Sequence, residues 1–304
     1  VLRWLHFSTR FYLRQMASFT PGVDEELVLA RLSNCIQEVR IWMANNFLKL
    51  NDEKTDFIII GNKYFMPQVQ CKSLTVGEQC VPTSTSVRNI GASLDSSLTI
   101  DTEIKAKCKS AWWQLYQISK IRRFLTPEQV KTVTVSLVLS KLDQNNSLLH
   151  DLPACVLLKL QRVQNSAARL LCSASRQVDA APLLVSLHWL PIKKRIMFKI
   201  VLLVYKCLNG IGPLYLSELL SFYSNTESRK CLRSSSLDNL HVPRTNTNFG
   251  DRSFLVCAPK LWNSLPFDLR NSPSVESFKK SLKTFLFWET EYYWGKHFWT
   301  HCGT

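Results

Sequence analysis

Residues Asp101 to Val130 read DTEIKAKCKSAWWQLYQISKIRRFLTPEQV, and here the pattern of the chain becomes helical. Within this stretch, Thr126-Pro127-Glu128-Gln129 is a strong helix start. Thr can cap the helix, Pro suits its first position, and Gln stands three residues after the cap. The helical pattern continues for about 120 residues, and prolines punctuate it where helices should begin or end: Pro153, Pro191 and Pro213. We therefore predict a helical bundle over residues 101–220.

The segment before this bundle mixes one helix with short strands. Between Asp24 and Asn46 the apolar residues recur at spacings of three and four, as in an amphipathic helix that faces a core. Two β-rich runs follow, Phe47–Leu50 and Phe57–Ile60, and we expect the second to be central in a small sheet. Residues 68–76 should add one or two edge strands. Residues 86–94 should form another strand-like stretch, bent at its glycine.

The C-terminal third is less regular. Residues 221–247 are rich in Ser, Thr and Asn and indicate a linker. A compact segment, 248–287, ends in a helix that opens at Ser272-Pro273 and should dock on the bundle. We assign no element to the tail, 288–304. The predicted divisions are 1–23 (divergent N-terminal segment), 24–100 (helix and short strands), 101–220, 221–247, 248–287 and 288–304. The predicted fold class is α+β, mainly α.

Basic residues outnumber acidic ones, 38 to 23, which gives a formal charge of +15. This charge creates an attractive field for polyanions, so nucleic acid is the leading candidate partner, and basic residues scattered for solubility are the alternative. The first candidate patch comprises Lys105, Lys107, Lys109, Lys120, Arg122 and Arg123. A second comprises Lys193, Lys194, Arg195 and Lys199, and a third Lys279, Lys280 and Lys283.

Aromatic residues interrupt the first patch at Trp112, Trp113 and Tyr116. Charges mixed with rings suit contact with a phosphate backbone and stacking on bases. The alternative is that the rings belong to the bundle core while only the charges face water. For Trp113 and Tyr116 we predict the core position.

Other site types find little support in the sequence. The ten cysteines are irregularly spaced, which favours a reducing, intracellular compartment. No C-x-x-C pair occurs, which argues against a zinc ribbon. The His297, His301 and Cys302 spacing is only a weak metal-ligand pattern. No apolar run approaches the roughly 20 residues of a membrane span, and no glycine-rich phosphate loop occurs. We expect no membrane association and no cofactor.

Several stretches resemble the downstream half of the reverse transcriptase of non-LTR (LINE-type) retrotransposons. They are residues 42–51 (WMANNFLKLN) with Lys54-Thr55, 87–91 (VRNIG), 121–125 (IRRFL), 161–171 (QRVQNSAARLL), 187–191 (LHWLP), 250–254 (GDRSF) and 261–266 (LWNSLP). They occur in the family's order over about Asp24 to Phe287. The resemblance implies the end of a polymerase palm, then a thumb and a C-terminal region.

In that family the activity is RNA-directed DNA synthesis with Mg²⁺. The resemblance places Lys54 at the position of a palm lysine, for which we favour a solvated charge, and makes Val87 and Gly91 primer-grip-like. The family's tandem aspartate occurs nowhere in the 304 residues. Because paired carboxylates hold the catalytic ions of such polymerases, we expect no catalytic residues and no polymerase activity of this chain alone. The expected function is residual binding of RNA or RNA–DNA duplex, and the resemblance implies a cytoplasmic or nuclear location. The alternative is a helical protein-interaction module derived from a retrotransposon.

Overall fold

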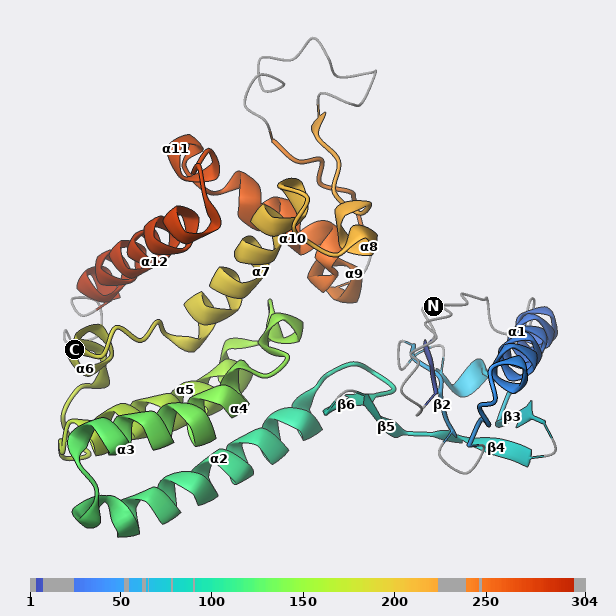
Figure 1. Ribbon diagram of the computed structural model, residues 1–304, viewed down its shortest axis with the longest axis horizontal. Coiled ribbons are helices and arrows are strands. Elements are labelled where there is room, and N and C mark those ends of the chain that lie inside the picture. The colour runs from blue at the N-terminus through green and yellow to red at the C-terminus, as the bar shows by residue number, and fades with distance from the viewer. Residues whose placement is uncertain are drawn as a thin grey trace. The chain divides into compact units, whose positions relative to one another are not determined.

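The computed structural model describes residues 4–7, 25–51, 55–61, 64, 66–77, 79–89, 91–223, 239–245 and 248–297. The chain forms two compact units, Val1–Lys105 and Ala106–Thr304, called here unit 1 and unit 2. Unit 1 holds a small sheet, and the described part of unit 2 is mainly helical (Figure 1). The predicted class, α+β and mainly α, is confirmed at this level.

Unit 1 is built on a mixed sheet in the strand order β1-β2-β4-β3. The strands are β1 (Trp4–Phe7), β2 (Thr55–Ile58), β3 (Ser73–Val76) and β4 (Gln79–Ser84). Strand β2 pairs antiparallel with β1 and parallel with β4, and β3 pairs antiparallel with β4. The predicted central position of the second β-rich run is therefore confirmed, as is an edge strand within residues 68–76. A short 3₁₀ helix, η2 (Met66–Gln68), precedes β3.

Helix α1 (Glu25–Asn45) supplies the other half of the unit 1 core. Its buried side chains Val28, Leu32, Ile36 and Met43 share one apolar cluster with β-strand residues such as Phe57. The spacing of these residues is the predicted amphipathic pattern, so this helix is confirmed. Burial of each such side chain contributes about 1.5–3 kcal/mol, and the cluster therefore fixes the helix on the sheet.

The predicted strand at Phe47–Leu50 is wrong. Phe47 has φ of 57° and is fully exposed, and the Leu48 N–H donates to the Met43 carbonyl at 2.8 Å. The chain therefore turns at the end of α1 instead of extending. Sequence reasoning also missed β4, since Pro82 argues against a strand. Pro82 pairs only with Ser73 of β3, and the pairing of β4 with β2 begins one residue later, at Thr83.

A hairpin leads from the sheet to the helical region. Strands β5 (Ser86–Asn89) and β6 (Ala92–Asp95) pair antiparallel, and Gly91 has φ of 77° in the turn. This positive φ explains why the bend uses a glycine. The Asp95 carboxylate then accepts hydrogen bonds from the N–H groups of Thr99 (2.8 Å) and Ile100 (3.1 Å), which fixes the chain just before the next helix.

Unit 2 is a succession of helices, as predicted for residues 101–220. The long helix α2 (Asp101–Ile121) begins in unit 1 and continues into unit 2. The others, in order, are η3 (Arg122–Phe124), α3 (Pro127–Thr134), η4 (Val135–Leu139), α4 (Ser140–Asp143), η5 (Asn146–Leu149), α5 (Ala154–Leu171), α6 (Ala180–Ser186), α7 (Ile192–Leu208), α8 (Leu214–Ser217), α9 (Asn248–Arg252), α10 (Phe254–Asn263), α11 (Phe267–Arg270) and α12 (Val275–His297).

The predicted start of α3 is confirmed by its hydrogen bonds. The Gln129 N–H donates to Thr126 Oγ1 at 3.3 Å, and the Thr126 N–H donates to Gln129 Oε1 at 2.9 Å. Pro153, Pro191 and Pro213 are the N-cap residues of α5, α7 and α8, as their positions in the sequence predicted.

Helix α12 docks on α7 through aromatic side chains. The Tyr205 and Phe278 rings stack with centroids 4.1 Å apart, and the Trp262 and Phe278 ring centroids are 6.0 Å apart. The Tyr205 hydroxyl also donates to the Ser272 carbonyl at 2.7 Å, where the docked segment begins. Docking of the C-terminal helix is therefore confirmed. The helix runs on to His297, so part of the stretch to which we assigned no element is helical.

Two glutamines of the 161–171 stretch join α5 to the start of α7. Gln164 is fully buried, and its Nε2 donates to the Leu190 carbonyl at 2.8 Å. Gln161 Oε1 accepts from the Ile192 N–H at 2.8 Å, and its Nε2 donates to Gln164 Oε1 at 3.0 Å. The structure thus brings the 161–171 and 187–191 stretches together, and these polar side chains serve the packing of the bundle.

Candidate nucleic-acid interface

Helix α2 presents two chemically different faces within the bundle. Ala111, Leu115 and Ile118 are at most 5% exposed and face the core of unit 2. The opposite side carries Lys109, Trp112, Trp113, Tyr116 and Lys120, continued by Arg123 and Phe124 in η3; we call this set the basic–aromatic stripe. Its members recur at spacings of three and four and occupy a face about 120° wide on a helix of 3.6 residues per turn.

The rings of the stripe are exposed. Trp112 is 45% exposed, Trp113 57%, Tyr116 55% and Phe124 75%. The prediction that Trp113 and Tyr116 belong to the bundle core is therefore wrong. Smaller aliphatic side chains fill the buried face of α2, and the large rings lie on the opposite face, which points away from the core. Exposed rings beside cations are the arrangement that stacking on nucleic-acid bases requires.

Cations and rings contact each other along this face. Lys120 Nζ lies 4.3 Å from the Tyr116 ring centroid, and Arg123 Cζ lies 4.7 Å from that of Phe124. Such cation–π contacts hold a positive charge beside an aromatic plane. The neighbouring Arg122 is exposed, and its Nη1 donates to the Leu170 carbonyl at 3.1 Å near the end of α5. Arg122 thus ties the end of the stripe to the bundle while it adds to the local positive charge.

Two members of the first predicted patch already have partners within the protein. Lys105 is exposed, belongs to unit 1 and forms an ion pair with Asp101 at 2.8 Å. Lys107 is only 7% exposed, and its ammonium group donates to the Gln144 carbonyl. Because a buried lysine with a backbone acceptor serves packing, Lys107 is not part of a phosphate-binding surface.

The second predicted patch also contains both exposed cations and a cation that is bound within the fold. Lys193 and Lys199 are exposed and Lys194 is half-buried on α7. Arg195 is instead bonded to Asp143 at the end of α4: Arg195 Nε donates to Asp143 Oδ1 at 2.8 Å and Nη2 to Oδ2. This bidentate, partly buried ion pair links α4 to α7 and therefore stabilises the packing of these two helices.

The third patch lies on α12. Lys280 is exposed, Lys279 forms an ion pair with Glu276 at 2.8 Å, and Lys283 Nζ lies 6.0 Å from the Phe287 ring centroid. The Lys279 ammonium, as hydrogen-bond donor, lowers the pKa of the Glu276 carboxyl from its usual range. One lysine of this patch is therefore partly neutralised by its own helix.

His150 has cations on several sides. Burial lowers the pKa of its imidazole; Asp151 opposes this effect, and Arg252, Lys193 and Lys260 reinforce it. Arg252 also donates to the Leu148 carbonyl at 3.4 Å. A histidine kept neutral in this way adds no charge to the surface.

Asp251 of α9 links the preceding segment to α10. Its carboxylate accepts from Thr245 Oγ1 at 2.8 Å and from Lys260 Nζ at 3.0 Å, and these two hydrogen bonds lower the pKa of the Asp251 carboxyl. Cys257 of α10 is buried, and this burial raises the pKa of its thiol to about 11. This region therefore serves the packing of the C-terminal segment.

The predicted palm positions lie in unit 1. Val87 is buried in β5, opposite Leu94 of β6, and Gly91 forms the turn of that hairpin. The hairpin thus holds both residues, but the Val87 side chain packs inward. Lys54 lies outside the described residues, as do His301 and Cys302 of the weak metal-ligand pattern.

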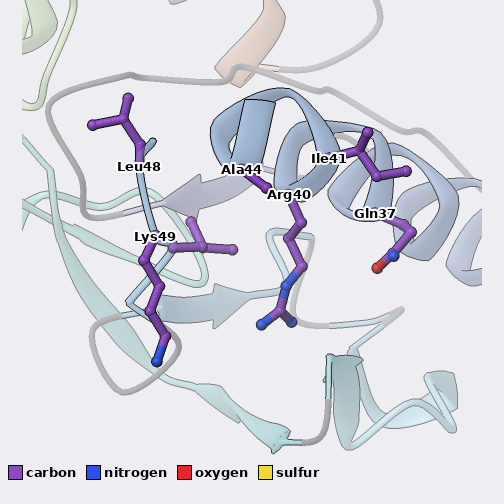
Figure 2. Close-up of a pocket in the computed structure, with 7 residues that line it drawn as sticks. Gln37, Arg40, Ile41, Ala44, Leu48 and Lys49 are labelled. Carbon is purple, nitrogen blue, oxygen red and sulfur yellow. The ribbon is translucent and has the colours of Figure 1, made fainter. Parts of the chain in front are cut away.

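A shallow pocket of about 280 Å³ opens at the end of α1. Figure 2 shows Gln37, Arg40 and Ile41 of α1 along it and Lys49 beyond the helix, with Arg40 and Lys49 extending in the same general direction. The Arg40 guanidinium packs directly against Gly77, where a Cβ would overlap it. With φ of 64°, Gly77 allows the turn between β3 and β4 and the close approach of Arg40. We assign this pocket to packing of α1 on the sheet.

Among the described residues, no group of three or more His, Cys, Asp and Glu side chains is arranged to hold a metal ion. Within the same residues, no helix combines the length and apolar character needed to cross a bilayer. Neither a family model, nor a curated protein, nor a solved structure matches this chain.

Proposed function

We propose that this chain binds nucleic acid through the basic–aromatic stripe of α2 and η3. The observation that carries the proposal is the exposure of Trp112, Trp113 and Tyr116 on the face that also holds Lys109 and Lys120. Exposed apolar side chains that gather on one surface mark an interaction site, whereas single exposed ones do not. Cations beside them select an anionic partner, and a formal charge of +15 for the whole chain supports the same choice.

The resemblance to the downstream half of LINE-type reverse transcriptases supports the same proposal. On that hypothesis the bundle is a thumb-like region that contacts nucleic acid and unit 1 is a remnant of the palm. Such a protein acts inside the cell, in the cytoplasm or the nucleus. We do not propose polymerisation by this chain alone, since its sequence has no tandem aspartate. Magnesium-dependent primer extension by the purified chain would contradict this part of the proposal.

The binding proposal is tested with fluorescent RNA and DNA oligonucleotides, whose anisotropy rises when the full chain binds. The double variant Lys109→Gln/Lys120→Gln should bind more weakly, and the slope of log affinity against log salt should fall by about 0.7 to 0.9 for each lysine that no longer pairs with a phosphate. Lys72→Gln is the matched control, because Lys72 is an exposed lysine of unit 1 outside the stripe. Equal weakening per substituted lysine in both proteins would show that only overall charge matters.

A protein partner is the second candidate, because exposed rings at helical spacing also suit an interface between proteins. Leu214 and Tyr215 of α8 are further exposed apolar side chains of unit 2, at 73% and 58% exposure. The two candidates differ in their response to salt. Failure of the chain to bind any oligonucleotide at about 50 mM salt would favour the protein partner.

A further inference from the structure

We infer that the ligand of the basic–aromatic stripe is a single-stranded nucleic acid, whose unpaired bases stack on Trp112, Trp113 and Tyr116. This inference rests on the proposed function and narrows it to one class of nucleic acid. The expectation from charge and resemblance was RNA or RNA–DNA duplex, and the inference excludes the duplex as the preferred ligand.

A duplex offers this face its phosphates but no free base planes. In a duplex the base planes are stacked on each other, and most contacts that a protein makes go to phosphates and sugars. The phosphates of a duplex would bind Lys109 and Lys120, but no free base face would be available to stack on the Trp and Tyr rings. An unpaired base has a free π-face, and every base type has one, so stacking needs no particular sequence.

The rings and cations of the stripe follow one another along one side of the helix. Trp112 and Trp113 lie one helical turn from Tyr116, and Lys120 and Arg123 follow on the same side. From Lys109 to Phe124 the stripe extends roughly 22 Å at 1.5 Å per residue. At about 3.4 Å per stacked nucleotide, this length matches roughly six nucleotides. The three rings therefore lie between flanking cations along the length of one short strand.

The rings of the stripe are exposed on the side of α2 that faces away from the core. Trp112, Trp113 and Tyr116 lie in unit 2, and the core side of α2 is filled by Ala111, Leu115 and Ile118. Lys120 and Arg123 already lie within 4.3 and 4.7 Å of ring centroids, so positive charge is available where a base and its phosphate would bind together. The stripe therefore offers rings on which a base can stack and cations that can pair with its phosphate.

The test compares a labelled single strand of about 12 nucleotides with a duplex of the same length and sequence, at one salt concentration. The full chain should bind the single strand at least about tenfold more tightly. The triple variant Trp112→Ala/Trp113→Ala/Tyr116→Ala should bind the single strand about tenfold or more weakly, since one stacked base is worth about this much. On the duplex its affinity should fall by less than about twofold.

Tyr215→Ala serves as the matched control, because Tyr215 is an equally exposed ring of unit 2 outside the stripe. It should bind both ligands like the unaltered chain. Circular dichroism should show that the triple variant keeps the helical content of the unaltered chain, since its rings lie outside the core.

Equal or tighter binding of the duplex would overturn the inference while the proposed function stands, and so would a triple variant that binds the single strand normally. Binding of neither ligand at low salt would overturn both. Equal weakening in the triple variant and in Tyr215→Ala would also refute a specific role of the stripe.

Discussion

Replacing Gln164 by leucine should destabilise unit 2, because Gln164 holds the turn before α7 from inside the bundle. Leucine fills a similar volume but cannot donate to the Leu190 carbonyl, to which Gln164 Nε2 is bonded at 2.8 Å. A buried acceptor left without its donor costs about 1–3 kcal/mol. Removal of the hydrogen bond from Gln161 adds little, since Gln161 Nε2 also reaches Asn165 Oδ1 at 2.7 Å. We expect a total decrease of about 2 kcal/mol in the free energy of unfolding.

For a unit of about 200 residues, each kcal/mol corresponds to about 2–4 °C, so the Tm of unit 2 should fall by about 4–8 °C. Thermal unfolding followed by far-UV circular dichroism measures this shift. Gln117→Leu is the matched control: Gln117 is a partly exposed glutamine of α2, and its replacement should change stability by no more than about 0.5 kcal/mol. A Gln164→Leu variant as stable as Gln117→Leu would refute the role assigned to this side chain.

Three further outcomes test other parts of the structure. Phe278→Ala should cost about 3–5 kcal/mol, because Phe278 is fully buried, whereas Phe267→Ala, at a half-exposed ring, should cost much less; equal costs by chemical denaturation would contradict the docking of α12. The lowered pKa of His150 means that the unfolded chain takes up this proton first, so stability should fall as pH drops below the ordinary value of 6.5 through the folded pKa. The His150→Gln variant should show a smaller fall between pH values of about 7 and about 5, and parallel curves would contradict this assignment. At neutral pH the Cys257 thiol, with its pKa of about 11, should react with a maleimide about 100-fold more slowly than exposed Cys155, as measured by peptide mass spectrometry; equal rates would show that Cys257 is accessible.

Local patterns in the sequence predicted much of the fold. The spacing of apolar residues indicated α1, and the signals around Thr126 indicated the start of α3, because both depend on neighbours within a few residues. The central position of β2 followed from its unbroken apolar run. The turn at Phe47 was missed, because the hydrophobic and β-forming residues there suggested a strand. No local sequence signal indicated the positive φ of Phe47.

The candidate site was predicted only in part. The sequence identified the mixture of cations and rings on α2, but it could not say which face the core would cover. Hydrophobicity favoured Trp113 and Tyr116 for the core, whereas Ala111 and Leu115 fill that position. Placing the residues of α2 around the helix axis separates two apolar faces, one with these smaller side chains and one with the large rings. Such a projection would have shown that the rings cannot share the face of Ala111 and Leu115.

Buried polar contacts could not be predicted from local sequence at all. Arg195 and Lys107 looked like surface charges, yet one binds the Asp143 carboxylate and the other a backbone carbonyl. Asp143 and Arg195 are 52 residues apart, and only the tertiary packing of α4 against α7 brings them together. Long-range partners of this kind decide which of the predicted cations remain available to a ligand.

The most direct test of the central claim is a salt titration of the binding of the full chain to a short single strand. Three to four phosphate contacts, from Lys109, Lys120, Arg122 and Arg123, predict binding that weakens roughly 20- to 50-fold between about 50 and 200 mM salt. Binding that does not change over this range, or no binding at its lower end, would contradict the assignment of the stripe to nucleic acid.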